Sequence, residues 1–289
     1  MSFQAEKFPL PFEGEEYLGH IAYPLDTTEQ RPLIIVCPNY AGLNEFDEAM
    51  CAYLASIGYV ALAIDVYGEA FPFDMRTNKS KFDPATASEH RHGAFAAMNA
   101  MLSDWAKFRR FLRAWIVAGK SHSAACSERC GAIGYCFGGC AVLEMVRDGI
   151  PGVQGVVSFH GVLTSYPQAL PDTPAPPMVS TPSNSYANKD VIVYIENGSD
   201  DHLVPDEAIR GFKDEMTGAG INWKFSDYAD TAHGFSLLAD AGYHEVSDRR
   251  SVQEMLALWA ELWPEVKQKY VAVNAAGTAM PPPVATAKM

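Results

Sequence analysis

Short apolar runs alternate with longer amphipathic segments along most of the chain. The apolar runs are rich in Val and Ile and are bounded by Gly, Pro, Asn or Asp, which is typical of buried strands. Seven such runs predict strands, at residues 17–23, 33–37, 60–64, 130–134, 153–159, 191–196 and 223–227. Strands that alternate with helices favour right-handed crossovers and a mostly parallel sheet. The pattern therefore predicts an α/β fold with helices on both faces of the central sheet.

Two amphipathic segments predict long helices. One carries apolar residues from Phe95 to Trp115 at steps of three and four, which predicts a single helix with one apolar face. The other carries a similar stripe from Val252 to Val266. Both stripes are interpreted as faces that pack against the core.

Three stretches interrupt this pattern. Residues 66–88 predict an irregular loop or a small cap. Residues 163–190, rich in Pro, Ser and Asn, predict a long surface excursion of the kind that forms lids, substrate loops or connectors. Residues 271–289 lack periodicity, and we expect a disordered tail there. The rest of the chain, 1–270, contains no internal repeat and is expected to form one domain.

Composition and charge exclude several classes of function. Of 289 residues, 48% are hydrophobic and 20% are charged, which excludes a disordered or collagen-like chain. The net charge of −13 argues against sequence-independent binding to nucleic acid or to an anionic membrane. No apolar run approaches the roughly 18 residues of a membrane helix, and the first residues carry no signal-peptide pattern. We therefore expect a cytoplasmic protein with mostly reduced cysteines. They are Cys37, Cys51, Cys126, Cys130, Cys136 and Cys140.

The segment Gly134-Tyr135-Cys136-Phe137-Gly138-Gly139 joins a predicted strand to a helical pattern. It matches the nucleophile elbow G-x-S-x-G, with cysteine in the serine position. Gly134 and Gly138 flank the cysteine because a Cβ at either position would collide with a neighbouring element. At the helix N-terminus, free N–H groups and the helix dipole favour a thiolate and a developing oxyanion. A buried structural cysteine is the alternative interpretation of this pattern.

Two later motifs contain the partners that such a nucleophile needs. Asp201 lies in NGSDDHLVP, just after the apolar run 191–196, and His233 lies in YADTAHGFSL. The order nucleophile, acid, histidine is that of the α/β-hydrolase triad. Both residues follow predicted strands, so their side chains can converge at the carboxyl edge of a parallel sheet.

Together, GYCFGG, GSDDHLVP and YADTAHGF resemble the dienelactone hydrolase family of α/β-hydrolases over about residues 30–265. The resemblance implies hydrolysis of a small ester or lactone through a thioester, with no cofactor and no metal. It places the triad on Cys136, Asp201 and His233. The family's acid precedes a Val-Pro segment, which favours Asp201 over Asp200, and His202 is expected to be a loop side chain.

The resemblance also implies an oxyanion hole made by the backbone N–H groups of Tyr40 and Phe137. Two positions depart from the family pattern. The family has a Glu at the position of Asn39, where it partners the cysteine in the resting enzyme, and a substrate-binding Arg near Leu237. Asn39 cannot take a proton at neutral pH, and Leu237 cannot bind a carboxylate. We therefore expect a neutral or differently anchored substrate.

Four residues are candidates for the substrate pocket, namely Asn39, Tyr135, His160 and Leu237. For His160, a place in the core or at the rim is the simpler interpretation. The sequence also contains Arg76 and Arg91 in or near the predicted cap, as candidate sources of positive charge.

Two other functions are considered. A non-catalytic ligand-binding protein on a hydrolase fold is the main alternative, because Asn39 replaces the family Glu. A redox or metal protein built on the cysteines is weaker, because their C-x3-C spacings differ from those of common zinc sites. The final Ala-Lys-Met loosely resembles the Ser-Lys-Leu peroxisomal signal, so the peroxisome is the alternative location. The oligomeric state is left open.

Overall fold

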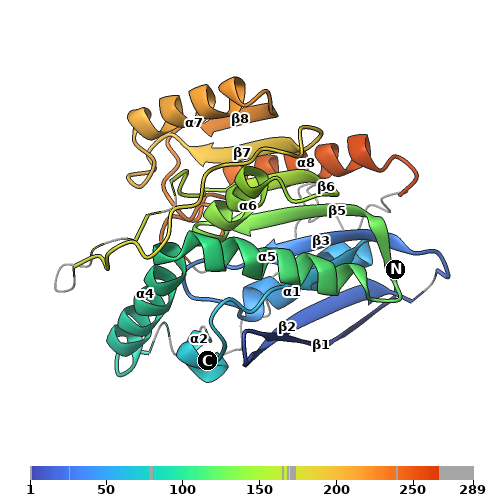
Figure 1. Cartoon of the computed structure of the whole chain (residues 1–289), viewed down its shortest axis with the longest axis horizontal. Coiled ribbons are helices and arrows are strands. Elements are labelled where there is room, and N and C mark those ends of the chain that lie inside the picture. The colour runs from blue at the N-terminus through green and yellow to red at the C-terminus, as the bar shows by residue number, and fades with distance from the viewer. Residues whose placement is uncertain are drawn as a thin grey trace.

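A computed structural model describes residues 2–25, 27–77, 81, 83–164, 166–167, 169, 174–238 and 240–266. Within these residues, eight strands form one sheet in the order β1-β2-β4-β3-β5-β6-β7-β8 (Figure 1). They are β1 (Phe3–Phe12), β2 (Glu15–Pro24), β3 (Arg31–Cys37), β4 (Val60–Ala63), β5 (Ala125–Tyr135), β6 (Val153–Phe159), β7 (Ile192–Gly198) and β8 (Asn222–Tyr228). Strands β3 to β8 pair in parallel and β1 and β2 are antiparallel, which confirms the predicted mostly parallel sheet.

The apolar runs predict seven of these strands and miss β1. β1 lies at the edge of the sheet and pairs antiparallel with β2 alone. It contains Pro9 and Pro11, which have no N–H to donate. A central strand must donate hydrogen bonds to neighbouring strands on both sides. An edge strand tolerates such residues, so the prolines obscure the strand in the sequence without preventing it.

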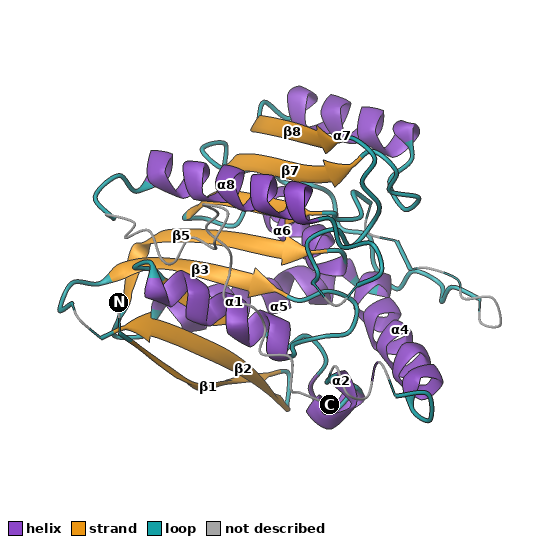
Figure 2. Ribbon diagram, turned by 180° about the vertical axis from the view of Figure 1, so that it is seen from behind, coloured by secondary structure: helices purple, strands orange, loops and turns teal. Residues whose placement is uncertain are grey.

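Helices cover both faces of the sheet, as predicted (Figures 1 and 2). One face packs against α1 (Glu45–Ser56) and α8 (Glu245–Leu262), and the other against α4 (Ala87–Ser103), α5 (Trp105–Lys120), α6 (Phe137–Asp148) and α7 (Asp206–Gly218). Leu33 and Ile35 of β3 pack on the face covered by α4 to α7, whereas Ile34 and Val36 pack on the face covered by α1 and α8. This alternation follows from the two-residue period of a strand, and it makes β3 fully buried on both sides.

The prediction of one long helix from Phe95 to Trp115 is wrong, because two helices share this apolar stripe. Between α4 and α5, Asp104 leaves the helical conformation, with φ −125° and ψ 80°. Its carboxylate accepts a hydrogen bond from the N–H of Lys107 at 3.0 Å and so caps α5. The spacing of three and four continues across the break, which is why the apolar pattern does not reveal it.

The cap region at residues 66–88 contains two short elements, η1 (Gly68–Ala70) and α2 (Phe73–Arg76). The predicted stripe near the C-terminal end belongs to α8, which ends at Leu262. The predicted tail at 271–289, including the final tripeptide, lies outside the described residues.

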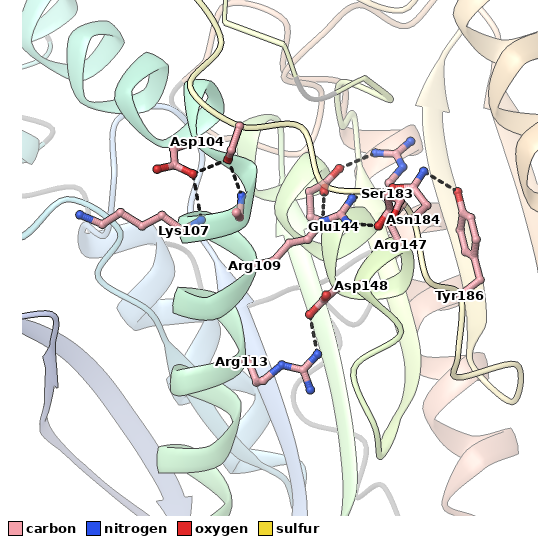
Figure 3. Close-up of polar contacts among 12 residues, drawn as sticks. Asp104, Lys107, Arg109, Arg113, Glu144, Arg147, Asp148, Ser183, Asn184 and Tyr186 are labelled. Atoms are coloured by element: carbon pink, nitrogen blue, oxygen red, sulfur yellow. Dashed lines mark hydrogen bonds and ion pairs between the residues drawn. The ribbon is translucent and has the colours of Figure 1, made fainter.

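Part of the 163–190 excursion is bonded to α5 and α6 by buried ionic groups (Figure 3). Glu144 of α6 is fully buried and pairs with Arg109 at 2.7 Å and with Arg147 at 3.0 Å. Arg109 also donates to the carbonyl of Ser183 at 3.1 Å and to Oδ1 of Asn184 at 2.6 Å. Removing one partner of a buried ion pair typically costs about 3–5 kcal/mol. Residues 183–184 are therefore bound to α5 through Arg109, which is itself paired with Glu144 of α6.

The N-terminus of α1 contains a buried carboxyl group. Asn44 caps the helix, since its Oδ1 accepts from the N–H of Phe46 at 3.0 Å. The N–H of Asn44 in turn donates to Oδ2 of Asp47 at 3.0 Å. Asp47 is fully buried, and this burial raises its pKa to about 8 although the hydrogen bond from Asn44 opposes the shift.

We expect Asp47→Asn to stabilise the protein most at alkaline pH. A carboxyl group whose folded pKa is raised destabilises the fold increasingly as pH rises from about 4, its unfolded value, to the folded value. Asparagine keeps an oxygen that accepts from Asn44 and removes the titration. Urea unfolding should show a stability gain larger at about pH 8.5 than at about pH 5, by on the order of 2 kcal/mol.

The control is Asp206→Asn in the exposed first turn of α7. A gain for Asp47→Asn that does not change with pH, or that Asp206→Asn reproduces, would contradict the prediction.

Candidate active site

Cys136 lies in the sharp turn between β5 and α6. Its backbone has φ 54° and ψ −110°, a conformation that residues other than glycine rarely adopt. A Cβ on Gly134 would lie 2.0 Å from the carbonyl oxygen of Gly138, and a Cβ on Gly138 would lie 2.1 Å from that of Cys37. Only glycine fits at both positions, which confirms the predicted elbow geometry and the steric reason for it.

Asp201 and His233 come from the loops that follow β7 and β8. His233 Nδ1 lies 2.8 Å from Asp201 Oδ2, and Oδ1 of the same carboxylate accepts from the N–H of Leu203 at 2.9 Å. The two loops are joined by a hydrogen bond from the N–H of Asp200 to the carbonyl of Thr231, at 3.0 Å. The side chain of Asp200 is exposed, so Asp201, as expected, is the acid beside His233.

Burial differs among the three groups in a way that suits proton transfer. The side chain of Asp201 is fully buried, that of His233 is 16% exposed, and Cys136 keeps 8% exposure. Burial alone lowers the pKa of His233. The charge of Cys136 and the hydrogen bonds to Asp201 and Cys136 outweigh burial and raise this pKa to about 10. The thiol, the imidazole and the carboxylate therefore form one interacting series.

The loop after β3 carries Tyr40 and is held by hydrogen bonds to Asn39. The N–H of Gly42 donates to the carbonyl of Asn39 at 2.9 Å, and the N–H of Ala41 donates to Oδ1 of Asn39 at 2.8 Å. Burial raises the pKa of the Tyr40 phenol, and the charge of Cys136 raises it further. The side-chain oxygen of Asn39 thus binds the loop backbone.

Phe137 is the first residue of α6, directly after Cys136. The N–H groups in the first turn of a helix have no acceptor within that helix. The amide of Phe137 is therefore available beside the sulfur, as the elbow motif requires.

Three of the predicted pocket residues lie beneath the site. His160 is fully buried, with Nε2 2.9 Å from Ser236 Oγ and its ring centroid 5.1 Å from that of His233. Burial and the charge of His233 hold the pKa of His160 well below its usual value, so its ring is neutral. Tyr135 is 1% exposed and Leu237 is 9% exposed. All three support the site from the interior of the protein.

The two candidate arginines have different surroundings. Arg76 is 2% exposed and pairs with Asp65 at 2.6 Å, so its charge is neutralised inside the protein. Arg91 is exposed on α4, and its charge opposes the rise that burial causes in the Tyr40 pKa. Lys81 lies with its ammonium 5.7 Å from the centroid of the Tyr40 ring. Positive charge therefore reaches Tyr40 from Arg91 and Lys81.

Four further features concern metal binding, the cysteines, membrane-spanning helices and His202. In the part of the chain that the structure describes, no group of three or more His, Cys, Asp or Glu side chains is placed to share a metal ion. The six cysteines, all of them among the described residues, form no disulfide bond with one another. No helix among the described residues has both the length and the apolar character needed to cross a bilayer. His202 is an exposed loop side chain, as expected.

Sequence reasoning missed the residues that hold the loop of Tyr40 in place. Tyr67 donates from its hydroxyl to the carbonyl of Tyr40 at 3.0 Å. Asp65 accepts from the N–H of Tyr67 at 3.0 Å. The available signal was the polar segment Asp65-Val66-Tyr67 directly after a buried strand, where loops meet at the carboxyl edge of the sheet.

Comparison with known proteins agrees with this geometry. The family model described as "Dienelactone hydrolase family" matches residues 19–262. A relative from Bradyrhizobium sp., named "Probable 2-oxo-3-(5-oxofuran-2-ylidene)propanoate lactonase", is 24% identical over 222 residues, which cover 77% of this chain and 80% of the relative.

Solved structures show the same fold. The crystal structure of the dienelactone hydrolase-like promiscuous phosphotriesterase P91, from metagenomic libraries, superposes with a TM-score of 0.69 and 25% identity, over 91% of this chain and 99% of that one. The butyrate-bound esterase Est2 of Thermogutta terrifontis superposes with a TM-score of 0.57 and 17% identity, over 90% and 94% of the two chains. The chain thus has an α/β-hydrolase fold and belongs to the dienelactone hydrolase family.

Proposed function

We propose that this protein hydrolyses small esters or lactones through a thioester on Cys136. Its membership of the dienelactone hydrolase family supports an enzyme of the ester-hydrolase class. The observation that carries the cysteine mechanism is the series of Cys136, His233 and Asp201 at the carboxyl edge of the sheet. Nucleophile, base and orienting acid in this order are the elements of acyl transfer.

Acylation uses the charged pair of Cys136 and His233. The thiolate attacks the carbonyl carbon of the substrate, and the amides of Tyr40 and Phe137 hold the oxyanion that forms. Each such donor is worth about 3 kcal/mol in the transition state. The bond from the carbonyl carbon to the alcohol oxygen then breaks, and His233 protonates the leaving alcohol from Nε2, because Nδ1 is bonded to Asp201.

The surroundings of His233 set the timing of the proton transfers. Its largest charge interaction and one of its hydrogen bonds come from Cys136, and both raise its pKa against the lowering effect of burial, as do the hydrogen bond and the charge of Asp201. A thioester sulfur carries neither charge nor proton, so the two effects of Cys136 end when the acyl-enzyme forms. His233 then becomes a base that takes a proton from water. Water attacks the thioester carbonyl, the carbon–sulfur bond breaks, and the thiolate is restored.

The residues around the site support a small substrate without the family's carboxylate clamp. Leu237 lies in the interior, and the charge of Arg76 is neutralised by Asp65. An anionic group on the substrate would instead be attracted from the cap side, where Arg91 and Lys81 approach Tyr40. One relative is named a lactonase and one solved structure a phosphotriesterase, which makes lactones and activated esters the first substrates to test.

The alternative of a ligand-binding protein without turnover depends on Asn39. On the proposed mechanism the partner of Cys136 is His233, so a carboxylate at position 39 is not required. The oxygen of Asn39 instead holds the N–H of Ala41 in the loop of Tyr40. These contacts favour a catalytic protein.

For its location in the cell we propose the cytoplasm, with the peroxisome as the alternative through Ala287-Lys288-Met289. A fluorescent protein fused to the N-terminus should remain diffuse whether or not these three residues are present. Punctate fluorescence that disappears when they are deleted would overturn this proposal.

We expect Cys136→Ala to abolish ester hydrolysis while the protein stays folded. Loss of the nucleophile should reduce kcat on p-nitrophenyl acetate by about 1,000-fold or more. Cys126→Ala, which removes a partly exposed thiol at the start of β5, is the matched control and should keep full activity.

Wild-type protein should release one equivalent of p-nitrophenol in a burst and then turn over. Full activity in Cys136→Ala would refute the nucleophile, and a burst without turnover would favour the binding protein.

We expect the pKa of His233 to fall by about 2 units or more when Cys136 is converted to its S-carboxamidomethyl form. The uncharged thioether removes the charge and the hydrogen bond that raise this pKa to about 10, while burial remains. NMR titration of the imidazole signals measures the change. In wild-type protein, kcat/KM should decline as pH rises through about 10, since the imidazolium that protonates the alcohol is lost there. An unchanged His233 pKa after alkylation would contradict the proposed timing.

A further inference from the structure

We propose that Tyr67 is the positioning residue that sets the spacing between the two oxyanion donors, the amides of Tyr40 and Phe137. This inference rests on the proposed function, because it concerns how the same site stabilises charge. Tyr67 lies four residues after the end of β4 and is 3% exposed. Its hydroxyl and its ring contact opposite halves of the proposed oxyanion hole.

The hydroxyl of Tyr67 holds the loop that carries the first donor. It donates to the carbonyl oxygen of Tyr40 at 3.0 Å. The N–H of the same peptide unit belongs to Ala41 and donates to Oδ1 of Asn39 at 2.8 Å. Both polar ends of this peptide unit are therefore bonded, and its rotation would break one buried and one partly buried hydrogen bond. Because the N–H of Tyr40 belongs to the adjoining unit, holding one unit restricts the direction of the other.

The ring of Tyr67 contacts the residue that supplies the second donor. It lies nearly parallel to the ring of Phe137, with an angle of 14° between the planes and 6.2 Å between the centroids. Phe137 lies in the same way against Phe108 of α5, at 12° and 5.6 Å. The side chain of Phe137 is thus packed between the rings of Tyr67 and Phe108.

Tyr67 is itself held firmly. Oδ1 of the buried Asp65 accepts from the N–H groups of Tyr67 and Gly68, at 3.0 and 3.1 Å, and from Arg76 at 2.6 Å. The guanidinium of Arg76 lies 5.8 Å from the centroid of the Tyr67 ring. A Cβ on Gly42, whose φ is +76°, would lie 2.8 Å from that ring, so the loop backbone rests directly on it.

These contacts make Tyr67 a link between two segments that the sequence places almost 100 residues apart. Burial raises the pKa of its phenol well above the ordinary value, so the hydroxyl keeps the proton that it donates to Tyr40. Removing that hydroxyl should leave the nucleophile in place and loosen one side of the oxyanion hole.

The test uses Tyr67→Phe, which keeps the ring and removes the hydroxyl. With p-nitrophenyl acetate we expect kcat to fall about tenfold and KM to change by less than about twofold, because the lost interaction acts on the transition state. Iodoacetamide alkylation of Cys136 is the second readout, followed by mass spectrometry of the Cys136 peptide. This displacement at a saturated carbon forms no oxyanion, so its rate should stay within about twofold of wild type.

Tyr186→Phe is the matched control, since it also removes a bonded tyrosine hydroxyl but lies far from the site, against Glu215 of α7. Its kcat should equal that of the wild type. Asn39→Ala releases the other end of the same peptide unit and should reproduce the Tyr67→Phe pattern, which keeps the test valid if Tyr67→Phe does not fold. The double variant should lose less than the product of the two single effects.

The outcomes separate this inference from the function on which it rests. A wild-type protein that turns over no ester or lactone refutes the proposed function. An active wild type whose kcat is unaffected by Tyr67→Phe refutes only the role of Tyr67. Equal losses in hydrolysis and in alkylation also refute it, because the hydroxyl would then support the nucleophile or the fold in general.

Discussion

The site depends on a backbone contact in which the first turn of α6 lies against the carboxyl ends of β3 and β5. At Gly134 and Gly138 the approach is so close that a single carbon atom would fall about 2 Å from a carbonyl oxygen. The chain can make this turn only if Cys136 adopts a strained backbone, at a cost on the order of 1–3 kcal/mol. Apolar packing on both faces of the sheet holds it there, and so does the buried ionic group at Glu144, two turns further along α6.

Around this turn the ionisable side chains differ in burial, with Asp201 buried more completely than His233. Asp201 is fully buried and accepts from His233 and from the backbone, so its direction is fixed. His233 lies between this acid and the sulfur, and the neutral ring of His160 packs beneath it. The charge and hydrogen bond of Cys136 and those of Asp201 all raise the pKa of His233 and so stabilise a positive imidazole there. On the proposed mechanism, the part of this stabilisation that comes from Cys136 ends when the thioester forms.

The elements that the sequence predicts well are those whose causes are local. The glycines around Cys136 have one steric purpose, and the loops of Asp201 and His233 follow apolar strands, so position in the chain suffices to bring them together. β1 is missed because its prolines are acceptable only at a sheet edge, and the edge is not visible in the strand itself. The break at Asp104 is missed because a cap needs only one residue, and the apolar spacing continues through it.

The contacts of Tyr67 and Arg109 could not be predicted for a different reason. Each joins segments 27 to 75 residues apart, and nothing in their immediate sequence names the partner. The position of Asn39 illustrates the limit most clearly. The sequence shows which residue replaces the family Glu, but only the structure shows that its oxygen is already bound to the neighbouring backbone.

That substitution has a consequence for how reactivity is controlled. Where the family pattern has a carboxylate that engages the cysteine before substrate arrives, this chain has a neutral amide bound elsewhere. On the proposed mechanism, no competing base holds the sulfur in an inactive arrangement, and the sulfur is already paired with His233 before substrate binds. Discrimination among substrates must then come from admission to the site, not from activation by the correct ligand. Such a thiol can also react with electrophiles and peroxides before substrate binds. The time for which the enzyme stays active therefore depends on a reducing environment.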